Sequence, residues 1–265
     1  MSETFNPDDW QAYTSSYSDL AHMSREQAIR HYETHGRKEG RVWNGKRAYF
    51  AKTYLKGDGI EIGALHNPLF VWPQARVKYV DVRDSHELNA HYPELGAATY
   101  RVDIVDDGET LSTIADGSLD FIIANHFLEH AEDFIGTVQN HVKKLRAGGI
   151  GYYATPDKRH SFDKDREMTT WEEMLADHAD GGHNSRRRHY VEWVTLVDKA
   201  PEAETEERVD ALMKKRYSIH FSVADFQRWC EHFASVQRHL NGAFRMLEAC
   251  ENHPLHETIH ILQKL

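Results

Sequence analysis

Residues 59–68 read Gly-Ile-Glu-Ile-Gly-Ala-Leu-His-Asn-Pro, and this stretch decides the fold prediction. Its first five residues predict a short apolar strand that ends at Gly63, where glycine lets the backbone turn tightly. Further strands are predicted at residues 77–82, 99–103, 119–124 and 149–155, with a helix at residues 133–145. Strands that alternate with helices in this way imply a parallel sheet covered on both faces.

The end of the sequence predicts how this sheet closes. A helix is expected at residues 224–233, followed by two strands at residues 235–240 and 258–262. Five parallel strands and a late hairpin make a Rossmann-like α/β fold with a seven-stranded, mostly parallel sheet. We assign this domain to residues 46–265. Residues 157–220 follow the fifth strand as a long polar segment, which we interpret as a loop that forms a lid over the acceptor site.

Residues 1–45 differ from the rest and predict a small helical module. Ser24 and Gln27 fit a capping box that opens a helix at Arg25, and Gly36 and Gly40 would end it. The stretch His31-Tyr32 followed by His-Gly-Arg-Lys-Glu-Gly-Arg at residues 35–41 resembles a short module of bacterial proteins of surface-glycan synthesis. The alternative is a docking helix that only packs on the main domain.

Composition restricts the partners of the chain. The formal net charge of −10 argues against broad binding to nucleic-acid phosphates, and the sequence has no apolar run long enough to span a membrane. The first ten residues do not resemble a secretory signal. The two cysteines form neither a metal-binding spacing nor a disulfide framework, so we expect a cytoplasmic protein. The 19 histidines could act as bases or metal ligands. The sequence indicates no oligomeric state.

Polar residues and glycine follow the predicted strands, at the edge of the sheet where open parallel sheets bind ligands. Gly63 ends the first strand, while Asp81 and Asp103 end the second and third. Asn125 and His126 follow the fourth strand. The loop after the first strand is not a G-x-G-x-x-G sequence, so it offers no obvious cradle for a dinucleotide pyrophosphate.

The motifs of this region resemble those of a family of class I S-adenosylmethionine (SAM) dependent methyltransferases, of the methyltransferase type 11-like kind. The shared motifs lie at residues 61–68, 79–81, 102–104, 124–130 and 148–159, and the resemblance spans residues 46–193. In the wider class the first motif is usually richer in glycine, and Ala64 and His66 stand where glycines often lie. The resemblance implies SAM binding by Glu61, Gly63, Ala64, Pro68, Asp81, Val82, Asp103, Ile104, Asn125 and His126. In this arrangement Asp81 would accept hydrogen bonds from the ribose hydroxyls and Asp103 one from the adenine amino group.

The acceptor is expected to be a sugar, a glycan or another small polar metabolite that is methylated on oxygen. A hydroxyl is a poor nucleophile at neutral pH, so a positioned base would assist the transfer. The residues predicted for this role are His160, His189, His220 and Asp157. No metal ligand is assigned, although the carboxylates and histidines of the segment could hold a divalent metal that orients a sugar diol.

Several alternatives remain open. His126 to His130 match the H-x-x-E-H pattern of zinc proteases, and Ser185-Arg-Arg-Arg-His189 could bind a phosphate or carboxylate instead of forming a solvated basic face. A nicotinamide-dependent sugar-modifying enzyme would need the glycine loop and a Tyr-x-x-x-Lys pair, and Tyr49 and Tyr54 lack that lysine. A non-catalytic SAM-binding regulatory or scaffold subunit would bind SAM without turnover.

Overall fold

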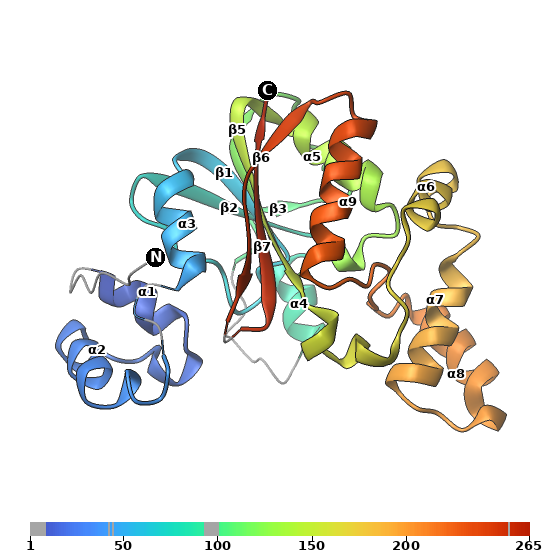
Figure 1. The fold of residues 1–265 in the computed structure, drawn as a ribbon, viewed down its shortest axis with the longest axis horizontal. Helices are drawn as coiled ribbons and strands as arrows, with labels where there is room; N and C mark the ends of the chain where they lie inside the picture. Colours follow the sequence, from blue (N-terminus) through green and yellow to red (C-terminus); the bar gives the residue numbers. More distant parts are fainter. Residues whose placement is uncertain (1–8, 42, 44, 93–100, 254) are drawn as a thin grey trace.

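The computed structural model describes residues 9–41, 43, 45–92, 101–253 and 255–265. A seven-stranded sheet crosses its centre in the order β3-β2-β1-β4-β5-β7-β6 (Figure 1). The strands are β1 (Gly57–Ile62), β2 (Ala75–Asp81), β3 (Ile104–Val105), β4 (Leu119–Asn125), β5 (Leu145–Pro156), β6 (Phe244–Asn252) and β7 (Glu257–Lys264). The first five run parallel, and β7 is antiparallel to both β5 and β6. This order confirms the predicted Rossmann-like α/β fold with a seven-stranded, mostly parallel sheet.

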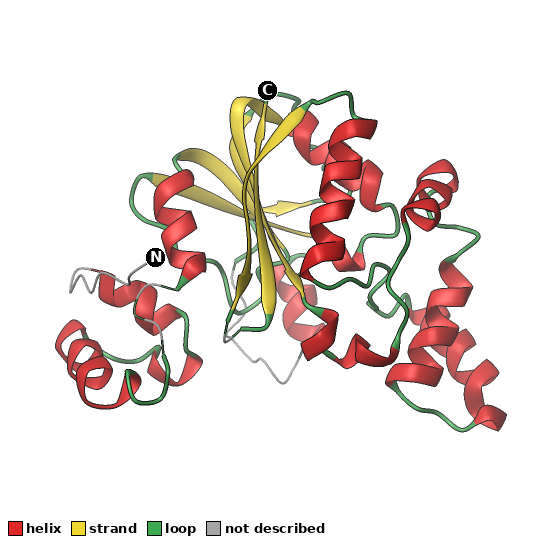
Figure 2. Ribbon diagram, viewed as in Figure 1, coloured by secondary structure: helices red, strands yellow, loops and turns green. Residues whose placement is uncertain are grey.

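Helices cover both faces of the sheet (Figure 2). On one face, α3 (Lys46–Tyr54) buries Phe50 and Ala51 against Ile123 of β4. On the other face, α5 (Phe134–Lys144) and α9 (Phe226–His239) bury a core of apolar side chains against β1 and β4. Asp133 caps α5 through a hydrogen bond from the Gly136 amide, so the predicted helix at residues 133–145 is confirmed.

Two strand predictions were wrong. Residues 235–239 belong to α9, because Trp229, Phe233 and Val236 keep a helical spacing and stay buried to the end of the helix. The sixth strand is β6, further along the chain. The predicted strand at residues 99–103 lies partly outside the described residues, and residues 101–103 are not strand. The third strand is β3, a two-residue strand at the edge of the sheet. It begins at Ile104, directly after the predicted range.

The segment from 157 to 220 is mainly helical, which corrects the prediction of a long polar loop. It contains α6 (Trp171–Asp180), α7 (Arg186–Glu192) and α8 (Glu202–Lys215), with short turns η6 (Lys158–His160), η7 (Phe162–Asp165) and η8 (Trp193–Val197). Thr170 and Glu173 form a capping box at α6. The helices α7 and α8 bury their own small core, which includes Tyr190, Val194 and Val209. The role of residues 157–220 as a lid over the acceptor site stays a prediction.

The N-terminal segment folds around its own aromatic core. It contains α1 (Trp10–Ser15), η2 (Ser18–Leu20), α2 (Arg25–His31) and η3 (Tyr32–Gly36). The capping box of Ser24 and Gln27 is confirmed. Tyr13, Tyr32 and Trp43 pack together at the centre of this segment, and an ion pair of 2.7 Å between Asp9 Oδ1 and Lys52 Nζ joins it to α3. It lies at the opposite end of the molecule from α7 and α8 (Figure 1).

The remaining described elements are the short helix α4 (Ser85–His91) after β2 and the turn η5 (Leu128–His130) after β4. Among the described residues, no helix combines the length and the apolar character that crossing a membrane requires.

The close approach of β1 and β4 at Gly59 leaves no room for a side chain. A Cβ atom there would lie 2.4 Å from the Phe121 carbonyl oxygen. We expect Gly59→Ala to lower the free energy of unfolding by about 1–3 kcal/mol, because the backbone of β4 would have to move. Urea denaturation measures this loss.

Gly45→Ala is the matched control, because the nearest atom to an added Cβ there is the Ser16 Oγ at 4.0 Å. Gly45 is the N-cap of α3, where alanine costs less than about 1 kcal/mol. Equal losses in the two variants would contradict the close approach of the strands.

Candidate functional site

The strand order reverses between β1 and β4, and this reversal opens a crevice at the carboxyl ends of the two strands. The backbone at this edge is unusual. Gly63 directly after β1 has a φ of +64°, while Leu65 and His126 adopt φ values of +48° and +50° that are costly for residues other than glycine. Strained residues of this kind gather at functional sites, so we expect a ligand to bind at this edge.

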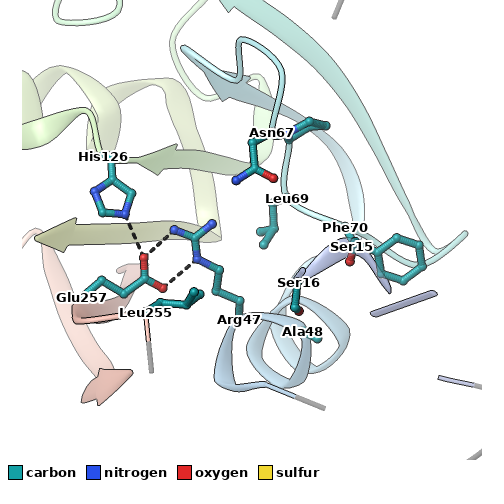
Figure 3. Close-up of a pocket in the computed structure, with 11 residues that line it drawn as sticks. Ser15, Ser16, Arg47, Ala48, Asn67, Leu69, Phe70, His126, Leu255 and Glu257 are labelled. Carbon is teal, nitrogen blue, oxygen red and sulfur yellow. Dashed lines mark hydrogen bonds and ion pairs between the residues drawn. The ribbon is translucent and has the colours of Figure 1, made fainter. Parts of the chain in front are cut away.

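A pocket of about 220 Å³ lies at this edge (Figure 3). It is lined by Ser15, Ser16, Arg47, Ala48, Asn67, Pro68, Leu69, Phe70, His126, Leu255 and Glu257. Its walls come from the end of α1, the first turn of α3, the loop after β1, the residue after β4 and the start of β7. The N-terminal segment therefore helps to form the pocket.

A charged trio spans this pocket. Arg47 Nε donates to Glu257 Oε1 at 2.7 Å, and a second guanidinium nitrogen donates to Oε2 of the same carboxylate. The ring Nε2 of His126 lies 2.9 Å from Glu257 Oε2 (Figure 3). Burial alone would raise the pKa of Glu257, but Arg47 and His126 lower it to about 2. The carboxylate is therefore ionised at neutral pH and holds both cationic neighbours in place.

His126 is positioned as a hydrogen-bond donor. Burial opposes its protonation, but its contacts with the carboxylates of Glu129 and Glu257 raise its pKa to about 9. Its side chain remains 43% exposed. At neutral pH the ring is an imidazolium whose two N–H groups face Glu257 and Glu129, so it cannot accept a proton.

Glu61, at the heart of the first motif, shapes the loop that follows β1. Its carboxylate is buried and accepts from the Leu69 amide with its two oxygens at 2.9 and 3.1 Å. The Asn125 Nδ2 lies 3.5 Å from Oε1. Burial raises the pKa of Glu61 to about 7, although the Leu69 amide and Arg47 counteract it. Through these bonds the carboxylate holds the loop of residues 63–69 in its conformation.

Two of the predicted adenosyl contacts lie on neighbouring strands at one edge. The Gly63 amide donates to the Val80 carbonyl at 2.9 Å, which puts Gly63 beside Asp81 at the end of β2. Asp81 is partly buried, and this burial raises its pKa. The exposed Val82 lines an open hollow with Arg83, Glu87 and Ala90. Ala64 follows Gly63 directly, Pro68 lines the pocket of Figure 3, and Asn125 ends β4.

Asp103 does not end the third strand, which corrects its predicted position. It precedes β3, and its Oδ2 accepts from the Tyr79 amide at 3.0 Å, two residues before the end of β2. Ile104 begins β3 opposite Val80, and its side chain packs against the core. The acids that follow β3 are Asp106 and Asp107. Because β3 has only two residues, the sequence pattern does not show where this strand begins and ends.

The four residues predicted as bases are dispersed, and within the described chain none of them lines the pocket of Figure 3. His160 is exposed on η6 and stacks on His256 at 4.5 Å. Asp157 is buried; its burial would raise its pKa, but Arg159 lowers it. His189 is buried with neither ring nitrogen hydrogen-bonded, and burial lowers its pKa to about 3.

His220 is the best oriented of the four. Its Nδ1 lies 2.5 Å from Asp163 Oδ2, and both residues are buried. Asp163 also accepts from Arg166 Nη1 at 2.9 Å, so the carboxylate is held from two sides. The Nε2 of His220 remains for another partner. Its use as a base stays a prediction, as do the roles of the other three residues.

The two alternative motifs, at residues 126–130 and 185–189, do not form the sites that their patterns indicate. His126 lies outside η5, and its left-handed backbone breaks the helical phase that a zinc-protease H-x-x-E-H motif requires. The arginines at residues 186–188 all form ion pairs: Arg186 with Glu132, Arg187 with Glu206 and Asp210, and Arg188 with Glu173 and Glu192. Carboxylates of this chain therefore occupy the proposed anion clamp.

The sequence analysis missed Arg47 and Glu257, which are 210 residues apart. Arg47 lies at the domain boundary that the sequence suggested, and Glu257 immediately precedes the last predicted strand. Only the fold brings the two together, because β7 runs antiparallel to β5 and so starts at the carboxyl edge of the sheet.

No family model matches the sequence, and no curated protein matches it. Among solved structures, a SAM-dependent methyltransferase from Aquifex aeolicus is similar at 11% identity and a TM-score of 0.46, over 99% of this chain and 100% of that one. A SAM-dependent methyltransferase from Methanosarcina mazei is similar at 14% identity and 0.42, over 80% and 95%. A structure of PigF with SAH is similar at 14% identity and 0.44, over 89% and 68%. The fold assignment itself rests on the strand order.

The buried pair of Arg47 and Glu257 gives a first test of the site. We expect Glu257→Gln to lower the free energy of unfolding by about 3–5 kcal/mol, because the arginine would lose its charge partner inside the protein. Glu251→Gln is the control, since Glu251 pairs with Arg159 at the surface and its loss costs about 1 kcal/mol or less. Chemical denaturation at neutral pH separates the two outcomes, and similar losses would show that the pocket pair is not buried.

Glu61 gives a pH-dependent test. Its pKa is about 7 in the folded protein against an ordinary value of 4.5. The native state thus binds the extra proton, and the stability it contributes is present below pH 4.5 and lost as the pH rises through 7. We expect Glu61→Gln to gain on the order of 3 kcal/mol relative to the parent protein between pH 4.5 and 8.

Denaturation curves at four pH values in this range measure that difference. Glu172→Gln, at an exposed position on α6, is the control and should follow the parent protein at every pH. A Glu61→Gln variant that also follows the parent at every pH would contradict the burial of this carboxylate.

Proposed function

We propose that this protein is a SAM-dependent methyltransferase that transfers a methyl group to oxygen of a sugar, a glycan or another small polar metabolite. The observation that carries the proposal is the pairing of Gly63 and Asp81 on adjacent strand ends at the reversal of strand order. Space above Gly63 is open, because a Cβ added there would meet no atom within 4 Å. A ligand can therefore approach the backbone closely at this point.

The residues present fit the cofactor. Asp81 has two acceptor oxygens for a pair of ribose hydroxyls, and the exposed Val82 offers an apolar surface beside it. Of the acids that follow β3, Asp107 is exposed, and we propose it in place of Asp103 as the acceptor for the adenine amino group. Gly63 and Ala64 would hold the amino-acid portion, with Asn125 at the end of β4 nearby. Bound there, SAM supplies an electrophilic methyl group on its sulfonium.

The pocket of Figure 3 is the proposed acceptor site. It adjoins the same strand ends, and the polar side chains of Asn67, His126 and Arg47 line it, as a site for a hydroxylated ligand requires. The imidazolium of His126 would place a positive charge beside the acceptor and help to align its hydroxyl for in-line attack on the methyl carbon. In that attack a carbon–oxygen bond forms, the carbon–sulfur bond breaks, and the hydroxyl proton leaves to a base or to water.

Calorimetric titration of SAM and of S-adenosylhomocysteine tests the cofactor assignment. We expect both to bind, and Asp81→Asn to weaken binding about 10- to 100-fold because charge-assisted hydrogen bonds to the ribose are lost. Asp58→Asn is the control. Asp58 is the second residue of β1, at the other end of that strand, and it forms an ion pair with Arg76. Binding of neither ligand, or equal weakening in the two variants, would rule out this site.

A methyl-transfer assay against activated and polymeric sugars then tests the acceptor class. Turnover with one of these sugars is the expected result. SAM binding without turnover on any sugar would reject the glycan assignment, while the cofactor assignment would still stand.

A further inference from the structure

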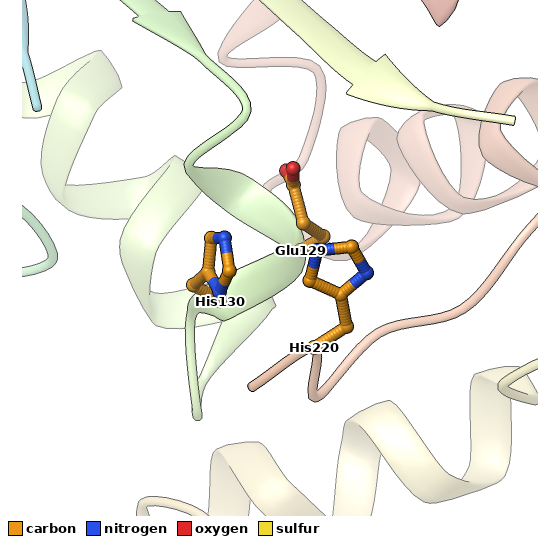
Figure 4. Close-up of side chains that lie close together, drawn as sticks. All are labelled: Glu129, His130 and His220. Carbon is orange, nitrogen blue, oxygen red and sulfur yellow. The ribbon is translucent and has the colours of Figure 1, made fainter. Parts of the chain in front are cut away.

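Three potential metal ligands converge where η5 meets the chain that returns from α8. Glu129 and His130 lie on η5, and His220 lies in the extended segment after α8 (Figure 4). One ligand atom from each side chain lies within 4.8 Å of the others. None of the three residues lines the pocket of Figure 3, although Glu129 lies 3.4 Å from His126, which does.

Both histidine rings are held by their Nδ1 atoms. His130 Nδ1 lies 2.9 Å from the Ile219 carbonyl oxygen and 3.0 Å from Ser218 Oγ. His220 Nδ1 lies 2.5 Å from Asp163 Oδ2. Histidines that bind metals usually donate one ring N–H to a carbonyl or a carboxylate, and this bond fixes the tautomer and leaves the other nitrogen for the ion. Both rings already have that arrangement, with Nε2 left over.

Glu129 has no hydrogen-bond partner for either carboxylate oxygen, although its side chain is fully buried. The nearest cationic group is the ring of His126, whose Nδ1 lies 3.4 Å from Oε1. A buried carboxylate without hydrogen bonds is costly unless a cation compensates it. His126 offsets this charge only across 3.4 Å, so both carboxylate oxygens can still bind a cation, and the two imidazoles beside them are ligands for the same ion.

The backbone holds the two halves of the cluster together. The amides of Phe221 and Ser222 donate to the Glu129 carbonyl oxygen at 2.7 and 3.1 Å. Arg166, buried beside Asp163, donates to the His220 carbonyl oxygen at 2.9 Å. These bonds fix the position of His220 relative to η5 before any ion binds, so that little ordering would be needed on binding.

We propose that Glu129, His130 and His220 form a binding site for a divalent transition-metal ion of the zinc class. Two imidazole nitrogens and one carboxylate oxygen suit Zn²⁺, which binds such ligands at about 2.0–2.2 Å. The three atoms would need to move together by roughly 1 Å, to the spacing of about 3.4 Å that tetrahedral coordination sets. Mg²⁺ prefers an octahedral shell of oxygen ligands and fits this donor set poorly.

The ion would have a defined structural effect. It would join η5, at the carboxyl edge of the sheet, to the segment that brings the chain back from α8. A three-residue ligand set leaves a fourth position for water or for a ligand oxygen. This inference stands without the proposed methyl transfer, because metal binding is measured directly on the protein.

The test uses the full chain after treatment with a chelator. Calorimetric titration with ZnCl₂ should show one strong site per chain, and titration with MgCl₂ should show none. We expect His130→Gln and His220→Gln each to abolish the strong site. Asp163→Asn should weaken it about 10- to 100-fold, because the ring of His220 loses its orienting carboxylate. His183→Gln is the control, since His183 is exposed and bonds only to the Asp180 carbonyl in its own turn.

Co²⁺ gives a second readout that does not depend on stability. In the parent protein it should produce the visible absorption of tetrahedral nitrogen and oxygen coordination, and this band should be absent in His220→Gln. Circular dichroism checks that each variant is folded, and Asp163→Asn replaces any variant that is not. The proposal is overturned if the parent protein binds no stoichiometric Zn²⁺, or if the strong site survives in both histidine variants.

Discussion

The buried ion pair between Arg47 and Glu257 joins the first helix after the N-terminal segment to the last strand of the sheet. Because the carboxylate also contacts His126, one side chain positions groups from three distant parts of the sequence. These charge-assisted contacts require that the carboxylate stays ionised. Its low pKa ensures that it does so throughout the physiological range.

The carboxyl edge of the sheet carries several buried acids, and their surroundings differ. Glu61 accepts from the backbone of the loop after β1, Glu257 is paired with Arg47, and Glu129 has no hydrogen-bond partner. Burial of a carboxylate is unfavourable unless hydrogen bonds or cations offset it. The fold therefore concentrates unfavourable electrostatics at one edge, which is where proteins of this architecture bind ligands.

Much of the fold could be predicted because local patterns match it. The apolar strands at β1, β4 and β5, the cap at Asp133 and the capping box at Ser24 all depend on neighbouring residues. The two failures have different causes. The strand β3 is too short to show periodicity, and the amphipathic spacing of α9 extends past the point where the helix was expected to end.

The candidate site was only partly predictable for a related reason. Gly63 and Asp81 were found because parallel strands place their carboxyl ends together. Arg47, Glu257 and the cluster of Glu129, His130 and His220 depend on contacts between residues far apart in sequence, and no local signal reports these. His189 was a plausible base in the sequence, but its ring is buried without polar partners, which only packing could reveal.

The pocket takes Ser15 and Ser16 from one part of the chain and Leu255 and Glu257 from another, about 240 residues later. A ribosome must therefore have extruded residue 257 before the cavity can exist at all. Until then Arg47 on α3 has no Glu257 carboxylate to pair with. The nascent chain also cannot be stabilised by a small molecule that binds in this cavity. Ligand-assisted folding at this position is thus confined to the period after residue 257 has left the ribosome.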